Sequence, residues 1–244
     1  MKTIIAVIGA NGFVGSEICK AVDDSEHHLC KITRNSPHKS YIEGSDIVIH
    51  SANPAGRYMA ENYPTKDFEE TVEKTAKFLE MSKGKRFVLI SSLSCRTQLD
   101  TNYGRNRRAC ELMTLQQGGL VIRLGPMFGG KRKKDMLHDI LLDRDVHIGA
   151  DSRYAYVSVA WNAKQVVDLS ESSSIPLVEL GARDSVRLGD IANYFGSKSE
   201  FLGEDEHQEP DPNMFWNWGP TAAKVYDYAQ KEMSEMCQKN WSLK

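Results

Sequence analysis

The sequence predicts an α/β fold built on a doubly wound parallel sheet. Short apolar segments alternate with segments of helical periodicity along the first three quarters of the chain. An apolar run without polar alternation is typical of a strand that is buried on both faces, as in a parallel sheet. Regular alternation of such strands with helices indicates βα units. A length of 244 residues allows one large domain, or one domain with a smaller lobe.

The apolar and periodic segments give the order of the expected elements. Strands are expected over residues 3–8, 29–33, 46–51, 86–92, 120–124 and 176–180, and helices over 16–22, 65–83, 103–117 and 163–169. Only residues 35–45 separate the second strand from the third. A single parallel crossover needs about a dozen residues, so a further strand with two crossovers does not fit there. We therefore expect a short helical bridge over 37–43, with strand 29–33 at the sheet edge beside the first strand.

Three glycines stand between the first strand and the first helix, in Gly9-Ala-Asn-Gly-Phe-Val-Gly15. The first two allow a tight turn and a close approach of backbone to ligand, and the third lets helix and strand pack closely. The helix N-terminus then directs N–H groups at an anion, here the pyrophosphate of a dinucleotide. An ordinary glycine-rich turn is the alternative. The sequence thus favours a Rossmann-type domain whose cofactor contacts include Gly9, Asn11, Gly12, Phe13, Val14 and Gly15.

Composition excludes several other classes of protein. The net charge is −2, from 31 basic and 33 acidic residues, so no global field favours nucleic acid or a membrane surface. Five cysteines without C-x-x-C spacing suit reduced thiols in a cytoplasm rather than a zinc site or disulfides. The opening apolar run is too short for a signal peptide, and none approaches the ~20 residues of a membrane span. We expect a cytoplasmic protein.

The pattern changes after Pro126. A basic run at 131–134 leads into mixed segments, an acidic loop at 204–211, and an aromatic cluster of Phe215, Trp216 and Trp218. We expect residues 1–130 to form the dinucleotide-binding domain, with 157–181 returning to it. Residues 131–156 and 182–244 would form a small substrate lobe. The basic run is either a solvated face or a diphosphate contact, and the aromatic cluster either stacks a substrate base or forms the core of the lobe.

Four further motifs follow the glycine run in a fixed order: Asp46-Ile-Val-Ile-His-Ser-Ala52, Ile90-Ser-Ser92, Tyr103-Gly-Arg-Asn-Arg107 and Arg123-Leu-Gly-Pro126. Together these motifs resemble those of the extended short-chain dehydrogenase/reductases, in the branch of NAD(P)-dependent nucleotide-sugar epimerases and dehydratases. The resemblance covers about residues 1–181. It implies a small-molecule substrate such as a nucleotide sugar, and it is compatible with a homodimer.

The resemblance implies that Ser92 and Tyr103 are the reacting pair. Ser92 ends a strand and Tyr103 begins a helix, so both hydroxyls could reach one substrate oxygen. A free phenol has a pKa near ~10, which is high for a base at neutral pH, so positive charge is needed nearby. The family supplies that charge with a lysine one helical turn on, but here the position is Arg107. Arginine keeps the charge and can hydrogen-bond a ribose, but it does not release a proton. The alternatives are an ordinary strand-end serine and a helix-capping tyrosine.

The choice of cofactor depends on the end of the second strand. An acidic residue there would accept from the ribose 2′-hydroxyl of NAD, but this chain has Thr33-Arg34. Arg34 could pair with a 2′-phosphate, so we expect NADP, with NAD possible; a solvated loop arginine is the alternative. The resemblance also places Ser51, Ala52, Asn53 and Pro126 beside the cofactor, together with Tyr103 and Arg107. His50, inside a strand, is expected to be a packed, hydrogen-bonded histidine. Arg153 is near the position where the family has a phosphate-binding arginine.

These expectations favour an NAD(P)(H)-dependent oxidoreductase or epimerase of the short-chain dehydrogenase class. Its catalytic residues would be Ser92, Tyr103 and Arg107, and it would act by tyrosine-assisted hydride transfer on a nucleotide-activated sugar or a similar carbonyl or hydroxyl compound. Dehydration ranks last, because Leu93 and Ser94 follow Ser92 where an acid pair is usual. The alternative is a non-catalytic NADP-binding redox sensor or scaffold of the same fold, which the arginine at position 107 favours.

Overall fold

The computed structural model describes residues 2–131, 135–212 and 219–241. The chain divides into two compact units. The first unit comprises Met1–Leu124 and Val159–Leu180, and the second comprises Gly125–Ser158 and Gly181–Lys244. Each unit has a hydrophobic core of its own. The role of the second unit as a substrate lobe stays a prediction.

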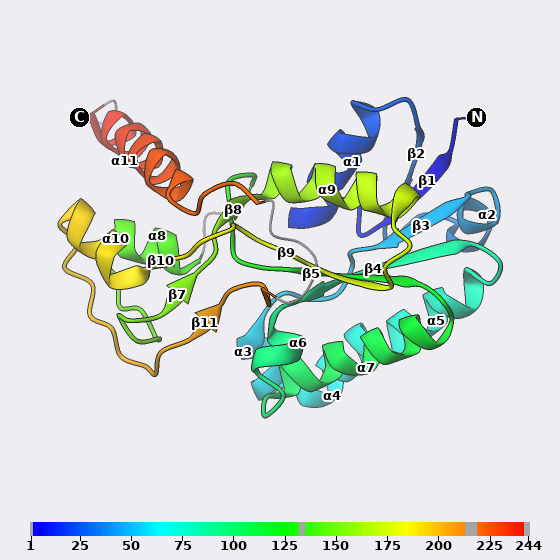
Figure 1. Ribbon diagram of the computed structural model, residues 1–244, viewed down its shortest axis with the longest axis horizontal. Helices are drawn as coiled ribbons and strands as arrows, with labels where there is room; N and C mark the ends of the chain where they lie inside the picture. The colour runs from blue at the N-terminus through cyan, green and yellow to red at the C-terminus, as the bar shows by residue number, and fades with distance from the viewer. Residues whose placement is uncertain (1, 132–134, 213–218, 242–244) are drawn as a thin grey trace. The chain divides into compact units, whose positions relative to one another are not determined.

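A parallel sheet forms the centre of the first unit (Figure 1). Within the described residues it has six strands, in the order β2-β1-β3-β4-β5-β9. They are β1 (Ile4–Ile8), β2 (His28–Ile32), β3 (Ile47–His50), β4 (Arg86–Ser92), β5 (Leu120–Leu124) and β9 (Leu177–Leu180). Every residue of β3 and β5 is buried, as apolar runs without alternation predict. The predicted α/β fold with a doubly wound parallel sheet is confirmed.

The edge of the sheet agrees with the length argument made from residues 35–45. Strand β2 pairs in parallel with β1, with Ile32 opposite Ile8, and it is the outermost strand on that side. The bridge to β3 contains a single short helix, α2 (His38–Glu43). The predicted edge strand and helical bridge are therefore confirmed.

Helices cover both faces of this sheet (Figure 1). One face carries α1 (Phe13–Asp23) and α9 (Val159–Ser172), which pack side by side. The opposite face carries α3 (Arg57–Asn62), α4 (Pro64–Phe68), η1 (Glu69–Glu73), α5 (Lys74–Met81), α6 (Ser94–Thr97) and α7 (Asn102–Gln116). The π-helical turn η1 joins α4 to α5, so these three form the helix expected over 65–83. Phe78 of α5 belongs to the same hydrophobic core cluster as Val48 and Leu89 of the sheet.

The second unit consists of short strands and helices. They are β6 (Met127–Phe128), α8 (Met136–Leu141), β7 (Arg153–Tyr154), β8 (Val157–Ser158), β10 (Val186–Arg187), α10 (Leu188–Phe195), β11 (His207–Gln208) and α11 (Lys224–Trp241). Strand β7 lies between β10 and β11, and β6 pairs with β8. The core of this unit includes Leu137, Ile140, Tyr154, Leu188 and Val225.

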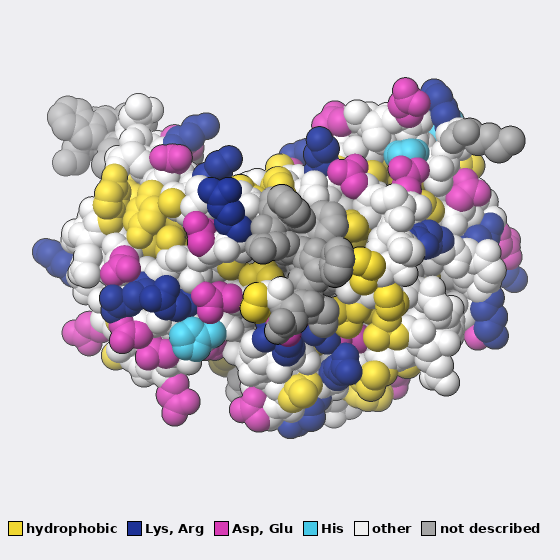
Figure 2. Space-filling view, viewed as in Figure 1, with side chains coloured by type: hydrophobic (Ala, Val, Ile, Leu, Met, Phe, Trp, Pro, Cys, Tyr) yellow, Lys and Arg dark blue, Asp and Glu magenta, His cyan; other side chains and the backbone are white. Residues whose placement is uncertain are grey.

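The charged side chains of the described residues show no segregation by sign on the face drawn in Figure 2. Basic and acidic groups are interspersed there, in agreement with a net charge of −2. Within the described part of the chain, no helix is both long and apolar enough to cross a membrane. The same residues contain no group of three or more His, Cys, Asp or Glu side chains arranged to hold a metal ion.

Candidate functional site

The three glycines form a turn that leaves no room for larger side chains. Gly9 has a φ of +84°, which L-residues rarely adopt, and its N–H donates to the Ile32 carbonyl at 3.1 Å. A Cβ on Gly9 would lie 2.9 Å from the Ala52 Cα. A Cβ on Gly15 would overlap the Gly9 carbonyl oxygen and lie 2.7 Å from the Ser51 Oγ. The glycine spacing is thus a steric requirement of this strand–turn–helix junction.

Helix α1 begins at Phe13, inside this glycine run, and its N-terminus suits an anion. Gly12, in the N-cap position, has extended backbone with φ −69° and ψ 170°. Among the described residues no side chain caps the helix, and its first turn contains no acidic residue. The first N–H groups of a helix lack partners within the helix and carry partial positive charge. These features fit a dinucleotide pyrophosphate beside Asn11 and Gly12, which are both exposed.

The segment 51–54, which follows β3, contacts the glycine turn. The backbone N–H and the Oγ of Ser51 both donate to the Ile8 carbonyl, each at 3.0 Å. Ser51 and Ala52 lie so close to the turn that Ser51 excludes a Cβ at Gly15 and Ala52 excludes one at Gly9. Farther on, the Oδ1 of Asn53 accepts a hydrogen bond from Thr75 at 3.4 Å. The structure therefore brings the predicted cofactor residues of the glycine turn together with Ser51 and Ala52.

His50, at the end of β3, is a packed core residue. Its Nε2 lies 3.1 Å from the Thr75 Oγ1, and its ring packs 5.3 Å from the ring of Phe78. Burial, reinforced by the charge of Lys74, lowers the pKa of His50 to about 3. The ring is therefore neutral at physiological pH. This agrees with the interpretation of His50 as a packed, hydrogen-bonded histidine rather than a catalyst.

Ser92 occupies the carboxyl end of β4, as predicted. Its side chain is half-buried, and its Oγ lies 3.3 Å from the Oγ of Ser94 and accepts the Ser94 N–H at 3.3 Å. The hydroxyl thus sits at the start of the turn that leads into α6. The side chain of Arg57 donates to the Ser94 Oγ at 3.5 Å, so a cation lies close to this strand end.

Tyr103 lies in the first turn of α7 and is 7% exposed. Two groups fix this end of the helix. The Thr101 Oγ1 caps it by accepting the Gly104 N–H at 3.0 Å. The carboxylate of Glu61, from α3, accepts the backbone N–H groups of Asn102 at 2.8 Å and of Tyr103 at 3.4 Å. A carboxylate at a helix N-terminus also interacts favourably with the helix dipole.

Arg107 lies one turn after Tyr103 and covers its ring. The guanidinium carbon is 3.4 Å from the ring centre, and Nη1 donates to the Tyr103 carbonyl at 3.3 Å. Nη2 donates to the carbonyl of Pro54, and the arginine is 4% exposed. A guanidinium over an aromatic face is a favourable cation–π arrangement. Arg107 therefore joins α7 to segment 51–54, and its predicted hydrogen bond to a ribose stays a prediction.

Arg34 is exposed in the turn that follows β2. The turn is held by the Thr33 N–H, which donates to the Ser36 Oγ at 2.9 Å. Two residues earlier, the Ile32 carbonyl accepts from both Gly9 and Ala10 in the glycine turn, at 3.1 and 3.3 Å. The backbone thus sets Arg34 beside the glycine turn. The charge of Arg34 also helps to lower the pKa of Glu70, which is lowered mainly by its hydrogen bond with Lys74.

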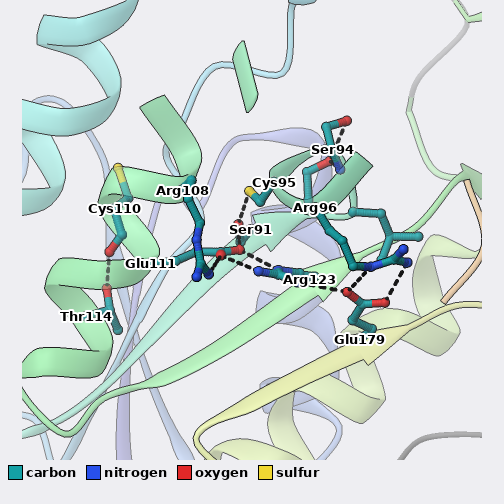
Figure 3. A network of polar contacts seen from close by, with 12 residues as sticks. Ser91, Ser94, Cys95, Arg96, Arg108, Cys110, Glu111, Thr114, Arg123 and Glu179 are labelled. Carbon is teal, nitrogen blue, oxygen red and sulfur yellow. Dashed lines mark hydrogen bonds and ion pairs between the residues drawn. The ribbon is translucent and has the colours of Figure 1, made fainter. Parts of the chain in front are cut away.

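A buried ionic network is the feature that the sequence reasoning missed (Figure 3). It connects Glu111 of α7 with Ser91, Arg123 and Glu179 of the sheet. The available signal was the presence of Arg123 and Glu179 inside strands that are otherwise apolar, because charged side chains are almost never fully buried unless paired.

The second unit contains the remaining predicted residues. Pro126 accepts the Val157 N–H at 3.1 Å, and Arg153 is exposed on β7. A pocket of about 300 Å³ is lined by Ala155, Ala182, Arg183, Asp184, Glu209, Pro210, Asp211 and Pro212. Residues 132–134 of the basic run and the aromatic cluster of Phe215, Trp216 and Trp218 lie outside the described residues. The cofactor role of Pro126 stays a prediction.

Comparisons with known proteins agree with this geometry. Residues 5–105 match the model of the NAD dependent epimerase/dehydratase family. The resemblance to the extended short-chain dehydrogenase/reductases is confirmed. The matched range contains the glycine turn, Arg34, segment 51–54, Ser92 and Tyr103, and it ends before Arg107. No curated protein sequence matches the chain.

Solved structures share the fold at low sequence identity. The UDP-N-acetylglucosamine 4-epimerase from Methanobrevibacter ruminantium M1, in complex with UDP-N-acetylmuramic acid, has a TM-score of 0.80 and 14% identity, over 98% of this chain and 100% of that chain. A UDP-galactose 4-epimerase has a TM-score of 0.74 and 20% identity, over 96% and 99%. The dTDP-4-dehydrorhamnose reductase from Bacillus anthracis str. Ames, in complex with NADP, has 0.75 and 16%, over 95% and 99%.

Proposed function

We propose that this chain is an NADP(H)-dependent oxidoreductase or epimerase acting on a nucleotide-activated sugar or a similar carbonyl or hydroxyl compound. One observation carries the proposal: segment 51–54 contacts the glycine turn through Ser51 and Ala52, and it contacts the Tyr103–Arg107 pair through Pro54. A dinucleotide site and a candidate acid–base residue are therefore built on one framework. The matching family model supports the same class of reaction.

The residues of this framework have distinct roles in the proposed reaction. The glycine turn and the N-terminus of α1 bind the pyrophosphate. The nicotinamide supplies hydride exchange with a substrate carbon when it is bound. Tyr103 transfers the proton to or from the substrate oxygen, and Ser92 donates a hydrogen bond to the same oxygen. Arg107 holds a permanent positive charge against the ring that carries the reacting oxygen.

The test is turnover by the purified protein of a panel of sugar nucleotides: reduction of 4-keto members with NADPH is followed as loss of nicotinamide absorbance, and epimerisation, which leaves the cofactor unchanged, is followed by separating the product isomers. Tyr103→Phe should lower turnover at least about 100-fold, because it removes only the acid–base hydroxyl. Its NADPH affinity should stay within a few-fold of the wild type. Tyr194→Phe, on an exposed tyrosine of the second unit, is the matched control and should leave turnover unchanged.

A non-catalytic NADP-binding sensor or scaffold is the second candidate. The observation that favours it is Arg107, whose guanidinium is bonded to Pro54 and stacked on Tyr103 where the family has a lysine. This candidate predicts NADPH binding with neither NADPH oxidation nor epimerisation for any member of the panel. Turnover that survives intact in Tyr103→Phe would instead refute the tyrosine mechanism while leaving the cofactor site in place.

A further inference from the structure

Three polar side chains lie in a row across the sheet, one residue before the carboxyl ends of their strands. Ser91 of β4 is opposite Arg123 of β5, and Arg123 is opposite Glu179 of β9. Residues at matching positions of parallel strands direct their side chains to the same face. All three side chains are buried, with Glu179 at 0% exposure. The row therefore forms a polar layer beneath the strand end that carries Ser92.

Glu111 of α7, the helix packed on this face of the sheet, completes the layer (Figure 3). Its Oε1 accepts hydrogen bonds from the Ser91 Oγ and from the Arg123 Nε, both at 2.7 Å. Its Oε2 accepts from the Arg123 Nη2 at 2.6 Å and from Arg108 at 3.0 Å. Both carboxylate oxygens are therefore bonded twice. Glu111 holds the end of β4 and the interior of α7 at the same time.

Glu179 closes the other end of the layer. It accepts from the Arg123 Nη1 at 2.9 Å, and Arg96 pairs with its two oxygens at 3.0 and 3.1 Å. Burial by itself would raise the pKa of Glu111, but the hydrogen bonds and charge of Arg123 outweigh this and lower it. Burial likewise disfavours charge on Arg123, but Glu111 and Glu179 raise its pKa. Glu111 and Arg123 are therefore both charged in the folded protein.

Such a network is a poor choice if stability alone is required. Replacing buried ion pairs by apolar residues of similar volume is often neutral or stabilising, whereas removing one partner is strongly destabilising. Well-attested buried polar groups instead specify one register or one relative placement of elements. The elements placed here are β4, which carries Ser92 directly after Ser91, and α7. On α7, Tyr103, Arg107 and Glu111 are spaced four residues apart and are all buried.

We propose that Glu111 is a positioning residue that sets the Ser92 and Tyr103 hydroxyls relative to each other, through its hydrogen bond to Ser91 and its ion pair with Arg123. The proposal rests on the proposed function, because it takes Ser92 and Tyr103 as the reacting pair. Glu111 acts from beneath the site. It aligns the strand and the helix, and it does not itself exchange a proton with substrate.

The kinetic test compares Glu111→Gln with a matched buried carboxylate. Asp67 is 4% exposed and accepts from Asn106 of α7 at 2.8 Å and from Thr71 at 3.4 Å, and none of these partners is on β4. Glu111→Gln should lower kcat about 10- to 100-fold, because small misplacements of reacting groups have effects of this size. Its KM and its NADPH affinity should stay within about twofold. Asp67→Asn should lower the melting temperature but leave kcat within about twofold.

A double-mutant cycle tests the route through Ser91. Ser91→Ala alone should lower kcat, and its loss should be smaller in the Glu111→Gln background, because a glutamine that no longer pairs fully with Arg123 already places β4 less accurately. Additive losses would overturn the proposed route. If Glu111→Gln does not fold, Ser91→Ala can test the proposal by itself, because it removes a single hydroxyl and leaves the ion pairs intact.

A measurement without turnover separates this proposal from the proposed function. In protein labelled with 13C at the tyrosine ring Cζ, the Tyr103 signal is assigned as the one lost in Tyr103→Phe. Glu111→Gln and Ser91→Ala should shift or broaden that signal, whereas Asp67→Asn should not. If the wild type turns over no substrate, the proposed function fails and the labelled ring still reports positioning. An unchanged Tyr103 signal in folded Ser91→Ala and Glu111→Gln would overturn the proposal.

Discussion

The two ends of the candidate site are built by different means. At the glycine turn, geometry is set by backbone and by the absence of side chains: Gly9 has a positive φ, and Gly15 lies against the Gly9 carbonyl. At the α7 end, geometry is set by long side chains, with Arg107 bonded to Pro54 and Glu111 bonded to Ser91. The first end therefore allows almost no substitution. At the second end, we expect that another cation can replace Arg107 without changing the arrangement of the site.

Gly15→Ala should have the largest effect, because it adds a side chain to the glycine turn, which has no room for one. Its Cβ would overlap the Gly9 carbonyl oxygen and lie 2.7 Å from the Ser51 Oγ, so backbone must move. We expect the free energy of unfolding to fall by about 3 kcal/mol, the upper range for overpacking. Dinucleotide binding should also be lost, because the displaced turn is the one proposed to hold the pyrophosphate. Denaturant unfolding and NADPH fluorescence titration measure the two effects.

Gly44→Ala is the matched control for this prediction. Gly44 follows α2 with a negative φ of −79°, and a Cβ there would make only an ordinary contact at 3.5 Å. We expect stability within about 1 kcal/mol of the wild type and unchanged NADPH binding. Equal effects of Gly15→Ala and Gly44→Ala would show that the lack of space around Gly15 is not what makes it necessary.

The contrast between the two ends also explains what could be predicted from the sequence. The glycine turn, the edge strand β2 and the bridge α2 depend on local spacing and on the length of one connection. The bond from Arg107 to Pro54 joins positions 53 residues apart, and the bond from Arg123 to Glu179 joins positions 56 apart. Spacing along the chain does not report such contacts. They follow from strand register and helix rotation, which the tertiary fold sets.

Arg107→Lys tests the α7 end and should have a smaller effect than Gly15→Ala. A lysine ammonium lacks the planar fork that bonds Pro54 while covering the Tyr103 ring. Loss of one charge-assisted hydrogen bond should lower the free energy of unfolding by about 1.5–2 kcal/mol. Turnover should be retained or raised, because lysine restores the arrangement of the family. Thermal unfolding and NADPH oxidation check the two parts.

The outcome shows whether Arg107 only joins two segments and supplies charge, or whether turnover requires arginine itself. Lower stability with intact turnover indicates a residue that joins α7 to segment 51–54 and supplies charge. Turnover abolished in Arg107→Lys, at unchanged NADPH affinity and in folded protein, would contradict the view that one cation can replace the other at this end.

Arg34→Ala should have the smallest effect, because Arg34 is exposed and its turn is held by Thr33 and Ser36 rather than by its own side chain. A 2′-phosphate beside the glycine turn would be within its reach, and the nearby Glu70 is already paired with Lys74. We expect NADP affinity to fall about tenfold, or about 1.4 kcal/mol, and NAD affinity to stay the same. Added salt should reduce the NADP preference of the wild type, because the pair of Arg34 and the 2′-phosphate is exposed to solvent.

Lys39→Ala, the same change of charge on α2, is the control and should alter neither affinity. Equal affinities of the wild type for NADP and NAD, or a preference that survives Arg34→Ala, would mean that this end of the site recognises the pyrophosphate through backbone alone.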